Sequence, residues 1–261
     1  MEIVSGIQQF EKAFASFSDS FIVIGGSACR AVLSDGPIQP RRTRDIDMVL
    51  VLENVGKDFI GAFWKFIKDG GYKFASRKNA EGEVKYVFYS FVGGVEGYPS
   101  QIEILSKPVG GIGLPADYHI EYIETDEDYS HLSAIILDTD YYAYLTIHYT
   151  VHEGIRYASP DSLICLKALA YMNLSAERAA GRQVNSDDLK KHRRDVMMAV
   201  AALDPSEVFV VSAHIKEILT SFVQAIAEPQ ISQSIAASLG VGVDYLDSLM
   251  AILKSNFTVA K

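Results

Sequence analysis

The chain has 261 residues, of which 49% are hydrophobic, and its 24 basic and 33 acidic side chains give a formal net charge of −9. This length and hydropathy suit one large or two modest domains with a sizeable core, and they exclude a mostly disordered chain. The negative charge argues against a protein whose whole surface binds nucleic acid, so we expect any RNA contact to be confined to a local basic patch.

Only two cysteines are present, Cys29 and Cys165, and both stand among apolar residues. Two are too few for a disulfide framework or a cysteine-rich metal site, so we expect both to be small core side chains in a reducing compartment. Glu2 stands where a secretory leader has basic residues, and no apolar run approaches the ~18 residues of a membrane span. We therefore expect a soluble, cytoplasmic protein without a membrane partner.

The first half of the chain alternates short apolar runs with glycine and charged turns. The runs rich in β-branched residues predict strands over 21–24, 45–52, 84–92 and 101–105. Helical spacing predicts helices over 6–17 and 57–68, the second with Phe59, Phe63, Phe66 and Ile67 facing the core. Residues 141–149 and 155–157 are expected to add β-like segments before the pattern changes.

The second half has fewer glycines and a period of 3.6 residues. The change falls at Ser159-Pro160-Asp161, where a capping serine, a proline at the first helical position and an acid in the first turn predict a helix. A second helix is predicted from Ser186. A third is predicted from Asp204-Pro205-Ser206-Glu207, which is close to a capping box. The remainder is helix-prone, with a break near Gly240.

Three acidic residues carry the strongest chemical signal. Asp45 and Asp47 alternate with Ile46 in a predicted strand, so both carboxylates share one face. They repel each other and lose hydration there, a cost that a divalent cation removes. Glu103 lies in another predicted strand. If the two strands are neighbours, three carboxylates converge, an arrangement that suits one or two Mg²⁺ ions bound to nucleotide phosphates. Taken singly, an Asp-x-Asp is more often a turn or cap pair.

Gly25-Gly26-Ser27 directly follows the predicted strand over 21–24. A diglycine permits a tight turn and lets backbone N–H groups approach a phosphate, while the hydroxyl of Ser27 can donate and the following helix offers its positive end. By itself a diglycine is most often a plain turn. Its position before the acids makes a phosphate site the more specific hypothesis.

These segments resemble the nucleotidyltransferase superfamily of the DNA polymerase β type, and within it the AbiEii abortive-infection toxins. The segments that carry the resemblance are Gly25–Ala28, Arg41–Met48 and Ile102–Ile104. The resemblance implies that Gly25, Gly26 and Ser27 bind a nucleoside triphosphate and that Asp45 and Asp47 hold metal. Glu103 corresponds to the third acid of the family, which is usually aspartate, and is expected to join the catalytic acids and metal ligands.

Two later segments are similar to helical motifs of the same family. Ser159–Lys167 looks like the helix whose lysine reaches nucleotide phosphates, and Arg193–Val196 looks like the motif whose acid is thought to be catalytic. The resemblance therefore implies a phosphate contact for Lys167 and a catalytic role for Asp195. Met198 stands where the family commonly has a second aspartate.

From the residues alone, simpler alternatives stay open for these positions. Lys167 is a lone charge in an apolar stretch, so it either extends to solvent or neutralises an anion. Asp195 is most simply paired with the lysine four residues before it. The basic run 41–44 is either a solvated loop or a contact for a triphosphate or polynucleotide. Arg42 is our choice as the phosphate contact, with Thr43 beside it in the nucleotide site.

These observations predict an α+β chain, with a nucleotidyltransferase-like mixed sheet over 1–158 and a helical domain over 159–261 that closes the cleft. The predicted activity is Mg²⁺-dependent transfer of a nucleoside monophosphate from a nucleoside triphosphate to a hydroxyl. The acceptor would be a tRNA, a protein or a small molecule, and the protein would be the toxin of a toxin–antitoxin system with an antitoxin partner. The alternative is a catalytically inactive module on the same fold that senses nucleotide or binds a partner.

Overall fold

The computed structural model describes residues 6–78, 84–105 and 138–260, and the chain divides into two compact units. Among the described residues, the first unit contains 6–27, 42–78, 84–105 and 151–157, and the second contains 28–41, 138–150 and 158–260. The chain passes for the last time from the first unit to the second after residue 157, and the sequence predicted this boundary after residue 158. The prediction of two continuous segments did not anticipate that residues 28–41 and 138–150 belong with the later helices.

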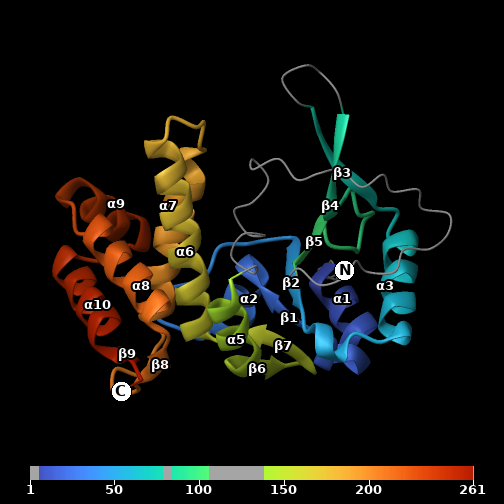
Figure 1. Ribbon diagram of the computed structural model, residues 1–261, viewed down its shortest axis with the longest axis horizontal. Helices are drawn as coiled ribbons and strands as arrows, with labels where there is room; N and C mark the ends of the chain where they lie inside the picture. The colour runs from blue at the N-terminus through green and yellow to red at the C-terminus, as the bar shows by residue number, and fades with distance from the viewer. Residues whose placement is uncertain (1–5, 79–83, 106–137, 261) are drawn as a thin grey trace. The chain divides into compact units, whose positions relative to one another are not determined.

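A mixed seven-stranded sheet, most of it in the first unit, runs in the order β3-β4-β5-β2-β1-β7-β6 (Figure 1). Its strands are β1 (Phe21–Ile24), β2 (Asp45–Leu50), β3 (Lys73–Lys78), β4 (Val84–Val92), β5 (Gln101–Leu105), β6 (Tyr149–His152) and β7 (Ile155–Ala158). β1 pairs antiparallel with β2 and parallel with β7, whereas β2 pairs parallel with β5, which pairs antiparallel with β4. The mixed sheet together with the helices confirms the α+β class.

The helical segments near the start of the chain connect these strands. They are α1 (Gly6–Phe14), the 3₁₀ turn η1 (Ala15–Ser20), α2 (Gly25–Leu33), the 3₁₀ turn η2 (Leu52–Asn54) and α3 (Lys57–Asp69). All four residues of β1 are buried, as expected for a central strand covered on both faces. The boundary between the two units falls inside α2, after Ser27.

An aromatic cluster forms the core between α1, α3 and the sheet. Phe10 and Phe14 are one turn apart on α1, and Phe59 and Phe63 are one turn apart on α3, so each pair faces the same side. The ring of Phe63 lies 5.5 Å from that of Phe91 on β4. Such ring pairs add about 0.5–1.5 kcal/mol each beyond their buried area. Helical spacing thus places this face of α3 on the sheet, as predicted.

The second unit is built mainly from helices. They are α5 (Thr139–Ile147), α6 (Pro160–Ala179), α7 (Ser186–Val200), α8 (Ala213–Ile226), α9 (Pro229–Leu239) and α10 (Val243–Asn256). Two short strands, β8 (Phe209–Val211) and β9 (Phe257–Val259), pair in parallel. Ser159 occupies the N-cap of α6 and Pro160 its first turn, which confirms the predicted start. Gly240 ends α9 in the left-handed conformation, which confirms the predicted break.

Two predicted elements are wrong. Residues 141–147 form helix α5, not a β-like segment, because the carboxylate of Asp138 caps the helix by accepting from the backbone N–H groups of Asp140 and Tyr141. The run Asp204–Glu207 does not begin a helix, because Asp204 accepts from both the N–H and the hydroxyl of Ser206 and closes a turn. The helix that follows, α8, begins after β8.

In the part of the chain that the structure describes, no single helix has the length and apolar composition needed to cross a membrane. The pair Pro229–Leu239 and Val243–Asn256 meets those two criteria only when taken together, and the two helices are bent by 102°.

Candidate functional site

The three predicted carboxylates lie on one face of neighbouring strands in the first unit. β2 and β5 pair in parallel, with Asp47 in register with Glu103 and Asp45 in register with Gln101. Residues in register on paired strands point to the same side of the sheet, and residues two apart on one strand share a face. The condition set by the sequence, that the two strands be neighbours, is therefore met.

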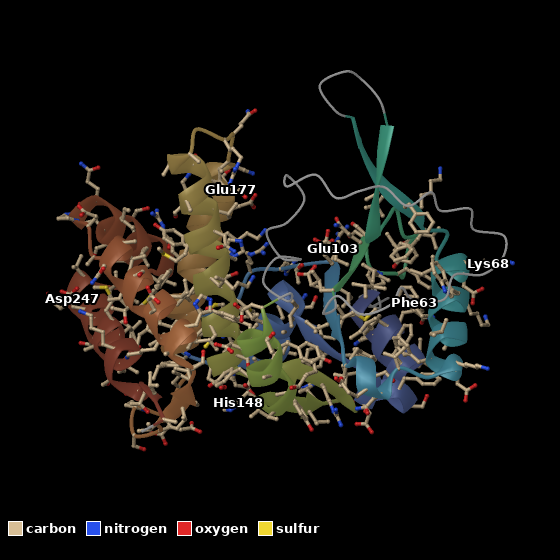
Figure 2. All side chains as sticks on the ribbon, in the orientation of Figure 1. Phe63, Lys68, Glu103, His148, Glu177 and Asp247 are labelled. Atoms are coloured by element: carbon tan, nitrogen blue, oxygen red, sulfur yellow. The ribbon has the colours of Figure 1, made fainter. Side chains whose placement is uncertain are left out.

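This acidic face is turned away from the aromatic core. Ile102 is in register with Phe91, whose ring contacts Phe63 of α3, so this side of β5 packs against the helix. Glu103 alternates with Ile102 and points to the opposite side. Figure 2 shows Phe63 on the α3 side of the sheet and Glu103 on β5, away from α3. The opposite face of β2 and β5 is buried, since Ile46, Met48, Ile102 and Ile104 are at most 4% exposed.

The carboxylate of Asp47 lies against the backbone of Gly25, the first residue of α2. Ile24 and Asp47 are in register on the antiparallel strands β1 and β2, which brings the strand end beside the acid. Gly25 has a φ of +70°, and a Cβ built there would overlap Oδ2 of Asp47. A glycine is therefore required both for the backbone conformation and for the space that the carboxylate takes.

Gly26 is covered by the side chain of Thr43. A Cβ on Gly26 would lie 3.3 Å from both Cβ and Oγ1 of Thr43. The same Oγ1 accepts a hydrogen bond of 3.3 Å from the backbone N–H of Asp45. Thr43 thus links the diglycine to the start of β2. Arg42, next to it, is exposed.

Ser27 follows the diglycine in the first turn of α2, and its hydroxyl is hydrogen-bonded to the protein backbone. Its hydroxyl donates to the carbonyl oxygen of Asp45 at 2.5 Å, and the residue is only 2% exposed. The bond ties the first turn of α2 to the first residue of β2. In this arrangement Ser27 fixes the spacing between the diglycine and the aspartates, a role that the sequence did not indicate.

Glu103 is held by two neighbours that the sequence did not single out. Its Oε1 accepts from Nε2 of Gln101 at 2.6 Å and from Oγ of Ser90 at 3.2 Å. Nε2 of Gln101 also donates to Oγ of Ser90 at 3.3 Å. Ser90 is the register partner of Glu103 on β4, so all three side chains share the acidic face.

The oxygen atoms on this face are the kind of ligand that Mg²⁺ prefers. Within residues 6–78, 84–105 and 138–260, no group of three or more His, Cys, Asp or Glu side chains is arranged to hold a metal ion. Mg²⁺, however, is usually bound through one or two carboxylates together with substrate phosphates and waters. Asp45 and Asp47 beside the N-terminus of α2 fit that kind of shared site, and they do not form a closed cage made by the protein alone.

Lys167 and Asp195 lie in the second unit and form a buried ion pair. Nζ of Lys167 is 3.4 Å from Oδ2 of Asp195, and their side chains are 7% and 2% exposed. Nη1 of Arg194 lies 3.9 Å from Oδ1 of the same carboxylate. Lys167 therefore neutralises an anion supplied by α7, and the expected partner of Asp195, Lys191, instead lies 3.5 Å from Asp188.

This ion pair lies close enough to Cys29 to influence its thiol. Burial raises the pKa of Cys29 to about 11, Lys167 lowers it and Asp195 raises it. Burial also raises the pKa of Cys165 well above its ordinary value. Both cysteines are free and buried, so both stay protonated and unreactive at neutral pH, as expected for core residues.

We expect Gly25→Ala to destabilise the protein and to displace Asp47. An L-residue at this φ costs about 1–2 kcal/mol, and overlap with the carboxylate adds on the order of 1–3 kcal/mol. Gly240→Ala is the matched control, because Gly240 has a φ of +71° with nothing within 4 Å of an added Cβ. Urea unfolding of both variants measures the difference. Equal losses of stability would show that Asp47 does not depend on the space at Gly25.

The chain was compared with protein families, curated proteins and solved structures. No family model, no curated protein and no solved structure matches it.

Proposed function

We propose that the first unit carries a metal-dependent nucleotidyltransferase site that moves a nucleoside monophosphate from a nucleoside triphosphate to a hydroxyl. The observation that carries the proposal is the juxtaposition of the Asp47 carboxylate with Gly25, at the start of a helix whose neighbouring strands present Asp45 and Glu103 on the same face. A helix N-terminus attracts phosphate, and adjacent carboxylates attract the cation that accompanies a triphosphate.

The order of these parts supports a nucleotidyltransferase-like fold, as the resemblance implies. A strand ends in the diglycine, an antiparallel neighbour carries the aspartate pair, and the next strand, parallel to that neighbour, carries the third acid. We extend the proposal to the chain after residue 158, where helices α6 to α10 would be the helical domain expected from the same resemblance.

The reaction would assign a task to each group of the first unit. Backbone N–H groups in the first turn of α2 have no partner inside the helix and would bind phosphate oxygens. Arg42 would neutralise phosphate charge, with Thr43 fixing the diglycine beside it. Asp45 and Asp47 would hold Mg²⁺, which supplies charge neutralisation and lowers the pKa of the attacking hydroxyl.

In the transfer step the acceptor oxygen forms a bond to the α-phosphorus while the bond from that phosphorus to the bridging oxygen breaks. Pyrophosphate leaves with the electron pair of the broken bond, and the hydroxyl proton passes to a carboxylate. In-line geometry and positioned charge account for most of the catalysis in this class of reaction. The acceptor proposed is a hydroxyl of tRNA, protein or a small molecule, and an antitoxin would be the protein partner.

The roles of Lys167 and Asp195 in this reaction stay predictions. Their ion pair gives each of the two side chains a structural partner that is independent of chemistry. Nucleotide affinity measured on folded Lys167→Met protein separates a phosphate contact from a purely structural lysine. Turnover of Asp195→Asn at saturating nucleotide tests the catalytic role in the same way.

Nucleotide binding tests the proposal directly. We expect ATP, CTP, GTP or UTP to stabilise the wild-type protein only when Mg²⁺ is present, by about 2.7 kcal/mol at a hundred times the dissociation constant. Thermal unfolding with each nucleotide, with and without Mg²⁺, measures this. Binding without any transfer to RNA, protein or small molecules would favour the inactive sensing module. If none of the four nucleotides stabilises the protein, both the nucleotidyltransferase and the sensing module are wrong.

A further inference from the structure

A segment without helix or strand, residues 34–41, follows α2 and belongs to the second unit. We call this segment the strap. Its Ile38 is only 8% exposed. A Cβ built on Gly36 would lie 3.6 Å from Cβ of Ala202, which follows α7. The strap is therefore packed, at Gly36 against the residues that end α7.

Hydrogen bonds within the strap and to the end of α2 give the segment a folded shape. The backbone N–H of Gly36 donates to the carbonyl oxygen of Leu33 at 3.0 Å. Nε2 of Gln39 donates to the carbonyl oxygens of Ser34 and Gly36 at 2.9 and 3.5 Å. These bonds join residues that are close in the chain, so they do not attach the strap to the later helices.

Arg194 of α7 connects the strap to two of those helices. Its Nη2 donates to the carbonyl oxygen of Gln39 at 3.2 Å, and its Nε donates to the carbonyl oxygen of Ser238 at 3.3 Å. Ser238 lies in the last turn of α9, where the carbonyl groups lack partners inside the helix. A guanidinium group has several N–H donors in fixed directions, so one arginine bonds both carbonyls at once.

We propose that Arg194 holds the strap against the helices of the second unit, and that the strap opens locally when this contact is lost while the helices stay folded. Segments without regular structure and with few buried side chains open at a lower free energy than the core does. Along the chain the strap lies between Ser27 and Thr43, so its opening frees the connection between the diglycine and the aspartate strand. This inference needs no ligand and does not rest on the proposed function.

Trypsin digestion of the folded full chain tests the inference. Cleavage after Arg41 or Arg42 requires the end of the strap to open, and its rate follows the population of the open form when opening and closing are fast. Loss of a hydrogen bond to a charged donor changes such a population by about 10–100-fold. We therefore expect Arg194→Ala to raise the initial rate of this cleavage by about 10–100-fold, measured by mass spectrometry.

Arg193→Ala is the matched control, because Arg193 donates to Oγ of Ser234 on α9. Its cleavage rate after Arg41 or Arg42 should equal that of the wild type. Cleavage after Lys167, which is buried in α6, reports the opening of the helices themselves. If Arg194→Ala raises cleavage after Lys167 by the same factor, Arg194 stabilises the whole unit and the inference is wrong. An unchanged rate after Arg41 and Arg42 would also overturn it.

Discussion

Asp47→Asn is expected to abolish nucleotide transfer while the protein stays folded. The substitution keeps the shape of the side chain beside Gly25 and removes the negative charge that would hold the cation. Loss of a ligand for a catalytic metal removes several kcal/mol of transition-state stabilisation. The ratio kcat/KM should therefore fall at least about a hundredfold. Initial rates of pyrophosphate release, measured over a range of Mg²⁺ concentrations, give this ratio.

The matched control for Asp47→Asn is Asp58→Asn. Asp58 is an exposed acid in the first turn of α3, where the helix dipole accounts for only about 0.3–1 kcal/mol. Its loss should leave kcat/KM unchanged. Near-normal turnover by Asp47→Asn would show that Asp47 is not a ligand of a catalytic metal ion. The proposal that the acid pair holds Mg²⁺ would then be wrong.

Lys167→Met is expected to destabilise the protein by about 3–5 kcal/mol, because it leaves the buried carboxylate of Asp195 without its nearest cation. From the sequence alone, Lys167 either extends to solvent or neutralises an anion, and only the first alternative would make the substitution nearly silent for stability. Chemical unfolding monitored by circular dichroism measures the change in free energy.

Two further variants test the cause of that loss. Lys65→Met removes the cation of the exposed pair with Asp69 on α3 and should cost no more than about 0.5 kcal/mol. The double variant Lys167→Met with Asp195→Leu removes both buried charges and should recover most of the lost stability, since apolar replacement of a buried pair is often neutral. A double variant as unstable as Lys167→Met would mean that packing, and not the unpaired carboxylate, causes the effect.

Local sequence patterns predicted most of the helices and strands, because the apolar runs and capping residues agree with how these segments are packed in the fold. β1 is four apolar residues between helices, and Ser159-Pro160 begins α6 as its capping residues indicate. The failure at α5 has a physical cause. Its tyrosines favour strands, but the Asp138 cap and the burial of Tyr141, Tyr144 and Leu145 at helical spacing outweigh that propensity.

The candidate site was predictable where it depends on strand alternation. The shared face of Asp45 and Asp47 follows from a period of two, and the register with Glu103 needed only that the strands be neighbours. The same alternation would have placed Gln101 beside Glu103, but no short motif marks an amide that donates a hydrogen bond to a carboxylate. Contacts between distant segments, such as Gly25 with Asp47, depend on the register of whole strands and cannot be read from local spacing.

In the proposed function, this chain transfers the α-phosphoryl group of a nucleoside triphosphate together with its nucleoside. The most direct test incubates the protein and Mg²⁺ with triphosphates labelled at either the α- or the γ-phosphorus, in the presence of total RNA, protein or small-molecule hydroxyl acceptors. We expect the α-label to appear in an acceptor, the γ-label to leave as pyrophosphate, and Asp47→Asn to yield neither product. Transfer of the γ-label to an acceptor, or no transfer of either label to any acceptor, would contradict it.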